Sequence, residues 1–496
     1  MTGLWNGKKR WVFITAIFVL ALITISGCGS TTVKPQDSLE AFTAYLDRRA
    51  PRLIERYDVP GMTIALVRGG ELVWSGAYGS ADLDQQREMT VETIFRVESI
   101  SKSVSAWGIT RLSEKELIDL DAPVQQYLGG WQMADTPFNE QAVTPRKLLN
   151  NNAGMPLGEI GRQYSPLGEV PSLREYLTKE AKLIKEPGTG FLYANTGYNL
   201  MELLVEEVTS RDFALYMAED VLEPLGMRHS SYDWDVSFNA AIATGYDLKG
   251  KAVPLYVYPA RASGGLFATV EDIARFAIAG MSAPYAPIQN VLAPDSIREI
   301  HTPRVKISGI YGVVADDYGY GHFIESLPDG RKAVWHGGQG NGWMTHFHLV
   351  PESGDAIIIL TNSQRSWPVM AQILTSWARW NGFGSVKMGL ISHGITATWV
   401  LISLMAMASL WTLYSLVIGL REGCRRFAPL SSDSRLKRWL QIGFHSAVIA
   451  GLVWSAAQPY LIISSILPGV ADWAGISVFI LSSIRILSAL FPRRAE

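Results

Sequence analysis

Ser99-Ile100-Ser101-Lys102 lies within the stretch Phe95-Arg-Val-Glu-Ser-Ile-Ser-Lys-Ser-Val-Ser-Ala-Trp107, just ahead of residues 104–117, which favour a helix. Positions i and i+3 share one helix face, so the Lys102 amine can approach the Ser99 hydroxyl. A serine alcohol needs a base within hydrogen-bond reach, and a buried lysine with a lowered pKa can serve. Alone the motif is weak, since Ser-x-x-Lys recurs by chance roughly once in a few hundred residues. The alternative interpretation is that these residues only begin a helix and that the Lys102 side chain lies in solvent.

The composition excludes several classes of protein. The chain has 496 residues and a formal net charge of −2, with no basic block outside its ends, so nothing indicates nucleic-acid binding. Its two cysteines, Cys28 and Cys424, lie in different contexts and imply no disulfide framework. The mean hydropathy of +0.11 is high for a soluble protein, and the apolar residues concentrate at the two ends.

The first 28 residues have the pattern of an export signal. Lys8, Lys9 and Arg10 precede an uncharged apolar run over residues 11–25, which is short for a membrane span. Ile25-Ser-Gly-Cys28 then resembles a bacterial lipobox, in which Cys28 is lipidated; an uncleaved signal anchor is the alternative. Either way we expect residues 29–37 to form a tether outside the cytoplasm.

Residues 38–382 show the alternation of a mixed domain. Strands are predicted over 62–67 and 72–78 around the turn Gly69-Gly70, and again over 318–324, 332–335, 346–350 and 356–361. Between them the periodicity predicts helices that include 199–209 and 270–280, the latter with Thr269 as N-cap. Helices over 38–57 and 369–380 flank the region. This order suggests a sheet completed late in the chain, with a helical lobe inserted.

The C-terminal region, 388–496, is predicted to be embedded in a membrane. Residues 388–420 and 441–471 carry no charged residue, and 473–491 form a third candidate span, weakened by Arg485. Arginines and lysines crowd the connection from Arg421 to Arg438, which the positive-inside rule assigns to the cytoplasm. The domain before the first span is therefore expected outside the cell membrane, in agreement with the export signal. For Arg485 we favour a side chain that reaches the inner interface over an intramembrane functional charge.

Three segments occur in order: Ser99-x-x-Lys102, Tyr193-x-Asn195 and His336-Gly337-Gly338. Together they resemble the class C β-lactamase-like branch of the penicillin-binding serine hydrolases, over roughly residues 38–362. With the C-terminal spans, the whole chain is similar to the FmtA-like (Flp-type) membrane proteins of Gram-positive bacteria. The resemblance implies an α/β (α+β) β-lactamase/transpeptidase-like fold, with an antiparallel sheet flanked by helices and an inserted helical lobe.

The resemblance also implies a set of catalytic roles. Ser99 would attack a carbonyl to form an acyl-enzyme, while Lys102 and Tyr193 share the proton transfer, and which of the two is the base stays open. Asn195 would bind the substrate's amide. The backbone N–H groups of Ser99 and Gln339, the latter following Gly338, would form the oxyanion hole.

The third motif departs from the family's usual Lys-Thr-Gly or His-Thr/Ser-Gly. His336-Gly337-Gly338 has no hydroxyl and no fixed cation, and His336 is expected to be charged only in part near neutral pH. Efficient β-lactam hydrolysis is therefore in doubt, and an ester or another D-amino acid amide is favoured. The alternative interpretation of His336 is that its imidazole only packs at the end of a strand and does not bind substrate. His346 and His348 share a strand face but have no third ligand in sight, so we expect no metal site.

We therefore expect an extracytoplasmic, membrane-anchored serine hydrolase that needs no cofactor. Its substrate would be a D-alanyl group of the cell envelope, in a peptidoglycan peptide or as an ester on teichoic acid, or a β-lactam. Alternatives are a small-molecule esterase or β-lactamase, and a catalytically inactive envelope-binding or sensor protein. Membrane lipid is the other expected partner.

Overall fold

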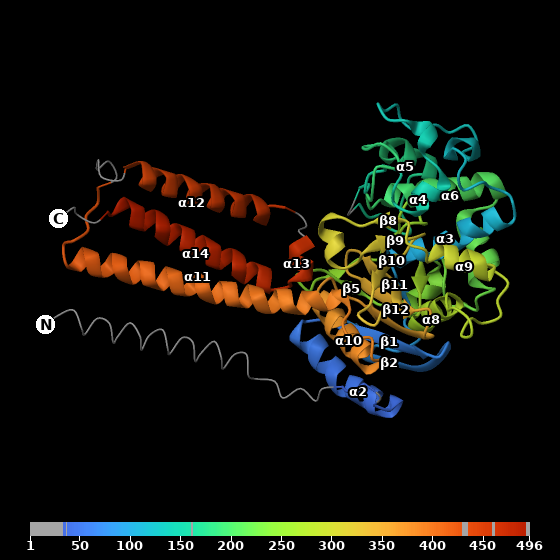
Figure 1. Cartoon of the computed structure of the whole chain (residues 1–496), viewed down its shortest axis with the longest axis horizontal. Coiled ribbons are helices and arrows are strands. Elements are labelled where there is room, and N and C mark those ends of the chain that lie inside the picture. The colour runs from blue at the N-terminus through green and yellow to red at the C-terminus, as the bar shows by residue number, and fades with distance from the viewer. Residues whose placement is uncertain (1–32, 36, 160–161, 429–434, 459–461, 493–496) are drawn as a thin grey trace. The chain divides into compact units, whose positions relative to one another are not determined.

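A computed structural model describes residues 33–35, 37–159, 162–428, 435–458 and 462–492 (Figure 1). The chain divides into two compact units, one comprising Pro35–Ile391 and the other Met1–Lys34 with Ser392–Glu496. The predicted export signal and Cys28 lie outside the described residues.

The strands and helices of the first unit alternate as a mixed domain. The strands are β1 Gly61–Arg68, β2 Glu71–Asp82, β3 Arg87–Glu88, β4 Phe95–Arg96, β5 Gly245–Tyr246, β6 Ala252–Val253, β7 Phe267–Ala268, β8 Val305–Lys306, β9 Asp317–Tyr318, β10 Phe323–Ser326, β11 Lys332–Gln339, β12 Met344–Val350 and β13 Asp355–Thr361. The α-helices are α2 Leu39–Arg56, α3 Ile100–Glu114, α4 Pro145–Leu149, α5 Leu173–Glu180, α6 Asn195–Thr209, α7 Phe213–Met217, α8 Val270–Ala279, α9 Pro294–Ile300 and α10 Trp367–Trp380. Short helical turns are η1 Val124–Tyr127, η2 Glu140–Ala142, η3 Ala218–Leu222, η4 Val236–Ala240, η5 Gly309–Val313 and η6 Lys387–Gly389.

One nine-stranded sheet forms the centre of this unit, in the order β3-β2-β1-β13-β12-β11-β10-β9-β8. Every pairing in it is antiparallel. The predicted hairpin of β1 and β2 is confirmed, and β1 pairs on its other side with the late strand β13, Met62 opposite Thr361. The sheet is thus completed by the end of the unit, as the strand pattern predicted.

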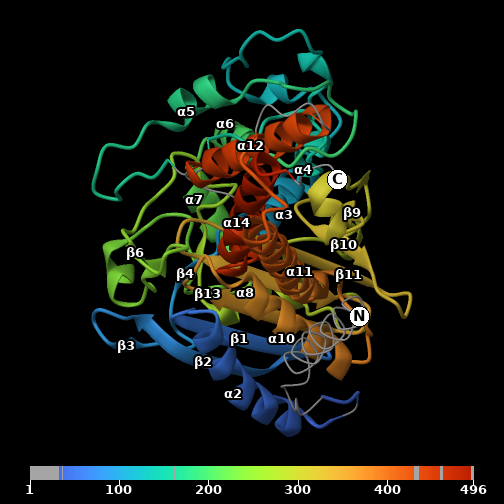
Figure 2. The same ribbon diagram turned by 90° about the vertical axis from the view of Figure 1, so that its left-hand side faces the viewer.

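Helices cover both faces of the sheet. Phe347 of β12 contacts Phe276 of α8, whereas the next residue, His348, contacts Trp377 of α10. Successive side chains of a strand point to opposite faces, so α8 and α10 lie on opposite sides. Helix α3 packs with α8 against β12, and α2 packs against α10. Figure 2 shows α2 beside β1 and β2 at one end of the unit.

Two predicted elements have different bounds in the structure. The strand predicted over 318–324 is two strands, β9 and β10, because the chain turns between them: Gly321 has a positive φ of 70° and the Gly319 N–H donates to the His322 carbonyl at 2.9 Å. The helix predicted to begin at Val104 begins at Ile100, which places Lys102 in its first turn. The inserted lobe, α4 to α7, lies in sequence between β4 and β7.

The second unit contains α11 Leu390–Arg421, α12 Arg435–Ala456, α13 Ile462–Ile466 and α14 Val470–Leu490. Three of these helices, α11, α12 and α14, are long and apolar enough to cross a membrane. The span predicted over 441–471 is wrong in its bounds: α12 occupies 435–456, and α13 is a separate short helix. Arg485 lies in the last turns of α14.

Candidate active site

Ser99 and Lys102 meet at the start of α3. Ser99 is the residue before the helix, and the Lys102 Nζ donates to the Ser99 Oγ at 3.2 Å. The same amine donates to the Asn195 Oδ1 at 2.7 Å and to the Ser263 carbonyl at 2.7 Å. The Lys102 amine therefore joins three segments that are distant in sequence, those of Ser99, Asn195 and Ser263.

The environment of Lys102 favours its neutral form. The side chain is completely buried, and this desolvation lowers the pKa of Lys102 to about 7, against the opposing charge of Glu98. Near neutral pH a large fraction of the amine can therefore accept a proton. This is the property that a serine nucleophile requires of its base.

Tyr193 lies beside both groups. Its ring centroid lies 5.0 Å from the Lys102 Nζ, and the nearby Ser99 side chain opposes part of the rise in its pKa. Burial raises the pKa of Tyr193 well above that of a free phenol, so the hydroxyl keeps its proton at neutral pH. Asn195 is the first residue of α6, so this helix begins before the predicted start at residue 199.

The third motif lies on β11 where this strand loses one neighbour. Pairing with β10 ends at Trp335, whereas pairing with β12 continues through Gln339, opposite Met344. A Cβ on Gly338 would lie 2.1 Å from the Val97 carbonyl oxygen, so this glycine lets the strand approach the residues just before Ser99. Gly338 and Gln339 thus lie at the strand end nearest the segment that carries Ser99.

His336 is buried and uncharged, which corrects the expectation of partial charge. Desolvation and the nearby Lys102 lower its pKa well below the usual range of histidine. The Nδ1 lies 2.8 Å from the Gly337 carbonyl, which can only accept, so Nδ1 carries the proton. The Nε2 then accepts from the Tyr318 hydroxyl at 3.3 Å.

The space beside Gly337 is filled by an aromatic ring. A Cβ on Gly337 would lie 2.9 Å from the Cη2 of Trp367, at the start of α10. The Trp367 indole also donates to the Gln339 Oε1 at 3.1 Å. The hydroxyl that related motifs carry at this position therefore has no room here unless Trp367 moves.

Sequence reasoning missed Asn151 and Asn152, which hold the loop that carries Tyr193. The Asn151 Oδ1 accepts the Ala194 N–H at 3.0 Å, and its carbonyl accepts the Leu192 N–H at 2.8 Å. The Asn152 Oδ1 accepts the Gly190 N–H at 2.9 Å. Asparagine tolerates a positive φ, which is 52° at Asn151, so the doubled asparagine was the available signal in the sequence.

Sequence reasoning also missed a buried ionic network around Glu98. Its carboxylate accepts from Arg96 Nε at 3.0 Å and from the hydroxyls of Tyr256 and Tyr258 at 3.0 Å each. Glu98 has a φ of 52°, in the left-handed region, immediately before Ser99. These contacts hold a strained residue in place and so fix the backbone next to Ser99.

A second buried carboxylate, that of Glu325, contacts His348 and the backbone of Lys387. The Glu325 Oε1 lies 3.4 Å from the His348 Nε2, and its Oε2 accepts the Lys387 N–H at 2.8 Å. Burial raises the pKa of Glu325 to about 7 and lowers that of His348 to about 3. His346 and His348 lie on the face that α10 covers, with Trp335 stacked on His348.

Comparisons with known proteins find relatives over most of the first unit. A family model described as "Beta-lactamase" matches residues 46–375. Penicillin-binding protein 4* of Bacillus subtilis is 22% identical over 324 residues, 61% of this chain and 68% of that protein. Protein flp of Staphylococcus aureus is 26% identical over 200 residues, so the chain spans only 40% of its length, with 40% of this chain covered. Among solved structures, the octameric penicillin-binding protein homologue from Pyrococcus abyssi matches with a TM-score of 0.55 and 25% identity, over 65% of this chain and 73% of that one.

Proposed function

The chain belongs to the beta-lactamase family, and from this premise we propose that it is a membrane-anchored serine hydrolase that forms an acyl-enzyme on D-alanyl amides or esters of the cell envelope. One observation carries the proposal: the Lys102 amine, whose pKa burial lowers to about 7, lies 3.2 Å from the Ser99 hydroxyl. A lysine that has only a structural role is seldom completely buried without a carboxylate as its ion-pair partner.

The proton transfers follow from the two pKa directions. Lys102 takes the proton of the Ser99 hydroxyl as its oxygen bonds to the substrate's carbonyl carbon, because only Lys102 is appreciably unprotonated at neutral pH. Tyr193, which stays protonated, donates to the leaving oxygen or nitrogen and regains its proton from Lys102. Water then attacks the acyl carbon, with its proton passing to Lys102. The acyl–Ser99 bond breaks as the Ser99 oxygen takes that proton from Lys102, which restores the free hydroxyl and the neutral amine.

The negative charge that develops on the substrate's carbonyl oxygen must be stabilised by hydrogen-bond donors. The N–H groups of Ser99 and Gln339 are the donors we assign, on the helix start and on the β11 end. The Asn195 side chain, held by Lys102 through its Oδ1, has its amide N–H₂ left to meet an amide carbonyl of the substrate.

The third motif favours a substrate with no carboxylate beside the scissile bond. His336 is neutral, and Trp367 fills the space of the missing hydroxyl. A β-lactam or a free D-alanyl terminus carries a carboxylate that such a site leaves uncompensated. Esters, such as D-alanyl groups on a teichoic acid, are therefore the favoured candidates, and a small-molecule esterase is the second.

The three candidate spans support a multi-pass membrane protein. If the hydrolase unit lies outside the cytoplasm, α11 enters, α12 returns and α14 enters again. Both the arginines from Arg421 to Arg438 and Arg493-Arg494 then lie on the cytoplasmic side, as the positive-inside rule requires. Lipidation of Cys28 would add a second anchor.

Intact-mass spectrometry of the full-length chain in detergent tests the proposal. It would be mixed with benzylpenicillin or with a D-alanyl ester, beside the Ser99→Ala variant. We expect an acyl adduct on Ser99 with the ester, a slower or absent one with penicillin, and none in Ser99→Ala. Absence of any adduct and of any ester turnover would contradict the function.

A further inference from the structure

Glu202 is a buried carboxylate to which the proton transfers above assign no role. It lies on α6 within the run from Leu200 to Val205, in which every residue is buried, and its own exposed fraction is 0%. Burial raises the pKa of Glu202 to about 7, although the Arg261 guanidinium opposes that rise. Glutamates are almost never fully buried unless they are paired. The contacts that offset the burial therefore indicate what Glu202 does.

These contacts hold the turn formed by residues 261–265, which precedes β7. The Glu202 Oε2 accepts the backbone N–H of Arg261 at 2.5 Å and that of Ala262 at 2.7 Å. The Oε1 accepts from the Arg261 Nε at 3.1 Å. The Arg261 carbonyl in turn accepts the N–H of Gly265 at 2.7 Å, which closes the turn. One carboxylate thus binds the 261–265 turn at its first two N–H groups.

The 261–265 turn also supplies an acceptor to the proposed base. The Ser263 carbonyl accepts from the Lys102 Nζ at 2.7 Å. Ser263 directly follows Ala262, so Glu202 and Lys102 bind adjacent residues of one turn. The Ala262 carbonyl is held as well, because it accepts from the Ser105 hydroxyl of α3 at 2.8 Å. A shift of the turn would therefore move the Ser263 carbonyl away from Lys102.

Helix α6 carries another contact of Lys102 on the same face. Asn195, whose Oδ1 accepts from Lys102 at 2.7 Å, lies seven positions before Glu202. That spacing is about two helical turns, so the two side chains lie on one side of the helix. One helix thus holds both of these acceptors of Lys102, directly through Asn195 and indirectly through Glu202 and the 261–265 turn.

The two acceptors set the direction of the amine's lone pair. The ammonium form of lysine has three N–H bonds, whereas the neutral amine has two and a lone pair. The contacts of Lys102 with Asn195 and Ser263 are its shorter ones, at 2.7 Å each, and they occupy both N–H bonds of the neutral amine. The lone pair is then left to face the Ser99 Oγ at 3.2 Å, as removal of its proton requires.

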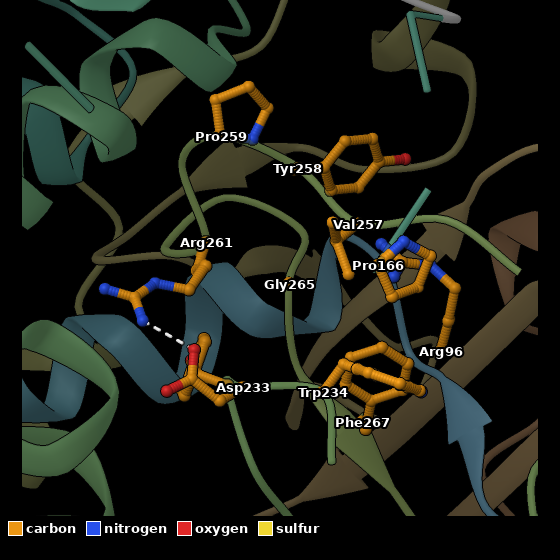
Figure 3. Close-up of a pocket in the computed structure, with 11 residues that line it drawn as sticks. Arg96, Pro166, Asp233, Trp234, Val257, Tyr258, Pro259, Arg261, Gly265 and Phe267 are labelled. Atoms are coloured by element: carbon orange, nitrogen blue, oxygen red, sulfur yellow. Dashed lines mark hydrogen bonds and ion pairs between the residues drawn. The ribbon is translucent and has the colours of Figure 1, made fainter. Parts of the chain in front are cut away.

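The chain offers a matched control for Glu202 on the same helix. The Arg261 guanidinium also pairs with the exposed Asp233, in the wall of the pocket drawn in Figure 3, and exposed ion pairs contribute little. Glu206, one turn after Glu202 on α6, pairs with that guanidinium at 3.3 Å. Its carboxylate accepts the Phe213 N–H at 3.3 Å, which lies outside the 261–265 turn. Removing Glu206 therefore disturbs the ion pairs and leaves the turn's two N–H contacts in place.

We propose that Glu202 is a positioning residue for the base: by holding the 261–265 turn, it keeps the Ser263 carbonyl on Lys102 and so directs the amine at Ser99. The proposal rests on the hydrolase function proposed above and deepens it. Glu202 acts on the reaction through Lys102.

Hydrolysis of p-nitrophenyl acetate by the full-length chain in detergent tests the proposal, because p-nitrophenolate leaves without a proton and acylation then depends on the base. Glu202→Met, which has no acceptor, should lower kcat/KM at least 10-fold. The pH midpoint of kcat/KM should rise above about 7, because a loosened turn admits water to Lys102. Glu202→Gln keeps an oxygen for both N–H groups and should stay within threefold of wild type. Glu206→Gln should stay within twofold, with its midpoint unchanged.

A double variant keeps the test decisive if thermal unfolding shows that Glu202→Met does not fold. Glu202→Met with Arg261→Met removes the buried ion pair as a whole, which proteins often tolerate, yet leaves the turn without its acceptor. Its kcat/KM should also fall at least 10-fold. Wild-type kcat/KM and pH midpoint in either folded methionine variant, or equal losses in Glu202→Gln and Glu202→Met, would overturn the positioning role. If the wild type releases no p-nitrophenol and intact mass shows no acetyl adduct on Ser99, the hydrolase function is overturned instead.

Discussion

The side-chain oxygen of Asn151 accepts the backbone N–H of Ala194 at 3.0 Å, between Tyr193 and Asn195. This hydrogen bond therefore holds Ala194, which lies between Tyr193 and Asn195, and both of these residues approach Lys102. Asn151 is itself buried and has a φ of 52°, a conformation that asparagine tolerates better than most residues. We regard it as a positioning residue for the Tyr193 loop.

Substitution of Asn151 can separate its hydrogen bond from its backbone conformation. Asn151→Gly keeps the left-handed conformation but loses the bond, so kcat for ester hydrolysis should fall about 10-fold with KM little changed. Asn151→Ala should lose about 1 kcal/mol more stability because of its positive φ. Asn151→Asp keeps an acceptor and should recover most of kcat. Equal kcat in all three, measured by steady-state kinetics beside thermal unfolding, would remove the positioning role.

The pH dependence of turnover should report Lys102. Its pKa of about 7 predicts that kcat/KM rises with pH through about 7 and reaches a plateau above it, since the neutral amine is the base. Without the desolvation, the rise would lie near the ordinary lysine value of 10.5. Lys102→Met should lower kcat about 1,000-fold or more and abolish this limb. A pH–rate profile that is flat from pH 5 to 9 would refute Lys102 as the base.

Gly337 and Trp367 should show coupled effects, because a Cβ at Gly337 meets the indole ring at 2.9 Å. Gly337→Thr alone should destabilise the protein by about 1–3 kcal/mol, as overpacking does. In a Trp367→Ala background the same change should cost at least 1 kcal/mol less, and it would supply the missing hydroxyl. Denaturant unfolding of the four proteins of this double-mutant cycle measures the coupling. Additive free energies would mean that the ring moves aside freely.

Glu325 should make the protein less stable as the pH rises. Its pKa is raised from 4.5 to about 7 in the folded state, so the folded protein binds the extra proton between these values. The stabilisation is complete below pH 4.5 and is lost as the pH approaches and passes 7. Glu325→Gln should therefore gain stability relative to wild type between pH 5 and 8, by at most about 3 kcal/mol. Chemical unfolding of both proteins at the two pH values checks this, and a pH-independent difference would contradict it.

The sequence was sufficient to predict which residues of the candidate site the structure brings together. Ser99, Lys102, Tyr193 and Asn195 were found because their motifs have fixed local spacings, and the strands near both ends of the domain were found from their alternation and turns. The β1–β2 hairpin needed only Gly69-Gly70 and its flanking apolar residues.

Features that depend on distant neighbours could not be predicted. His336 is neutral because it is buried against Lys102 and Tyr318, and no local pattern gives that burial. Trp367 fills the space beside Gly337 although thirty positions separate them in sequence. The helix was predicted to start at Val104, yet α3 begins at Ile100, and its first turn is completely buried by its tertiary contacts.

Because β1 pairs with β13, the sheet cannot be completed until most of the chain has been synthesised. Met62 leaves the ribosome early, but its partner Thr361 is made 299 residues later, shortly before α11 begins at Leu390. Until then the hairpin of β1 and β2 has an open hydrogen-bonding edge, which a chaperone or a neighbouring nascent chain could pair with. Completion of the hydrolase unit thus coincides with emergence of the first apolar helix, so a late truncation or a stalled chain would leave the whole sheet unfinished.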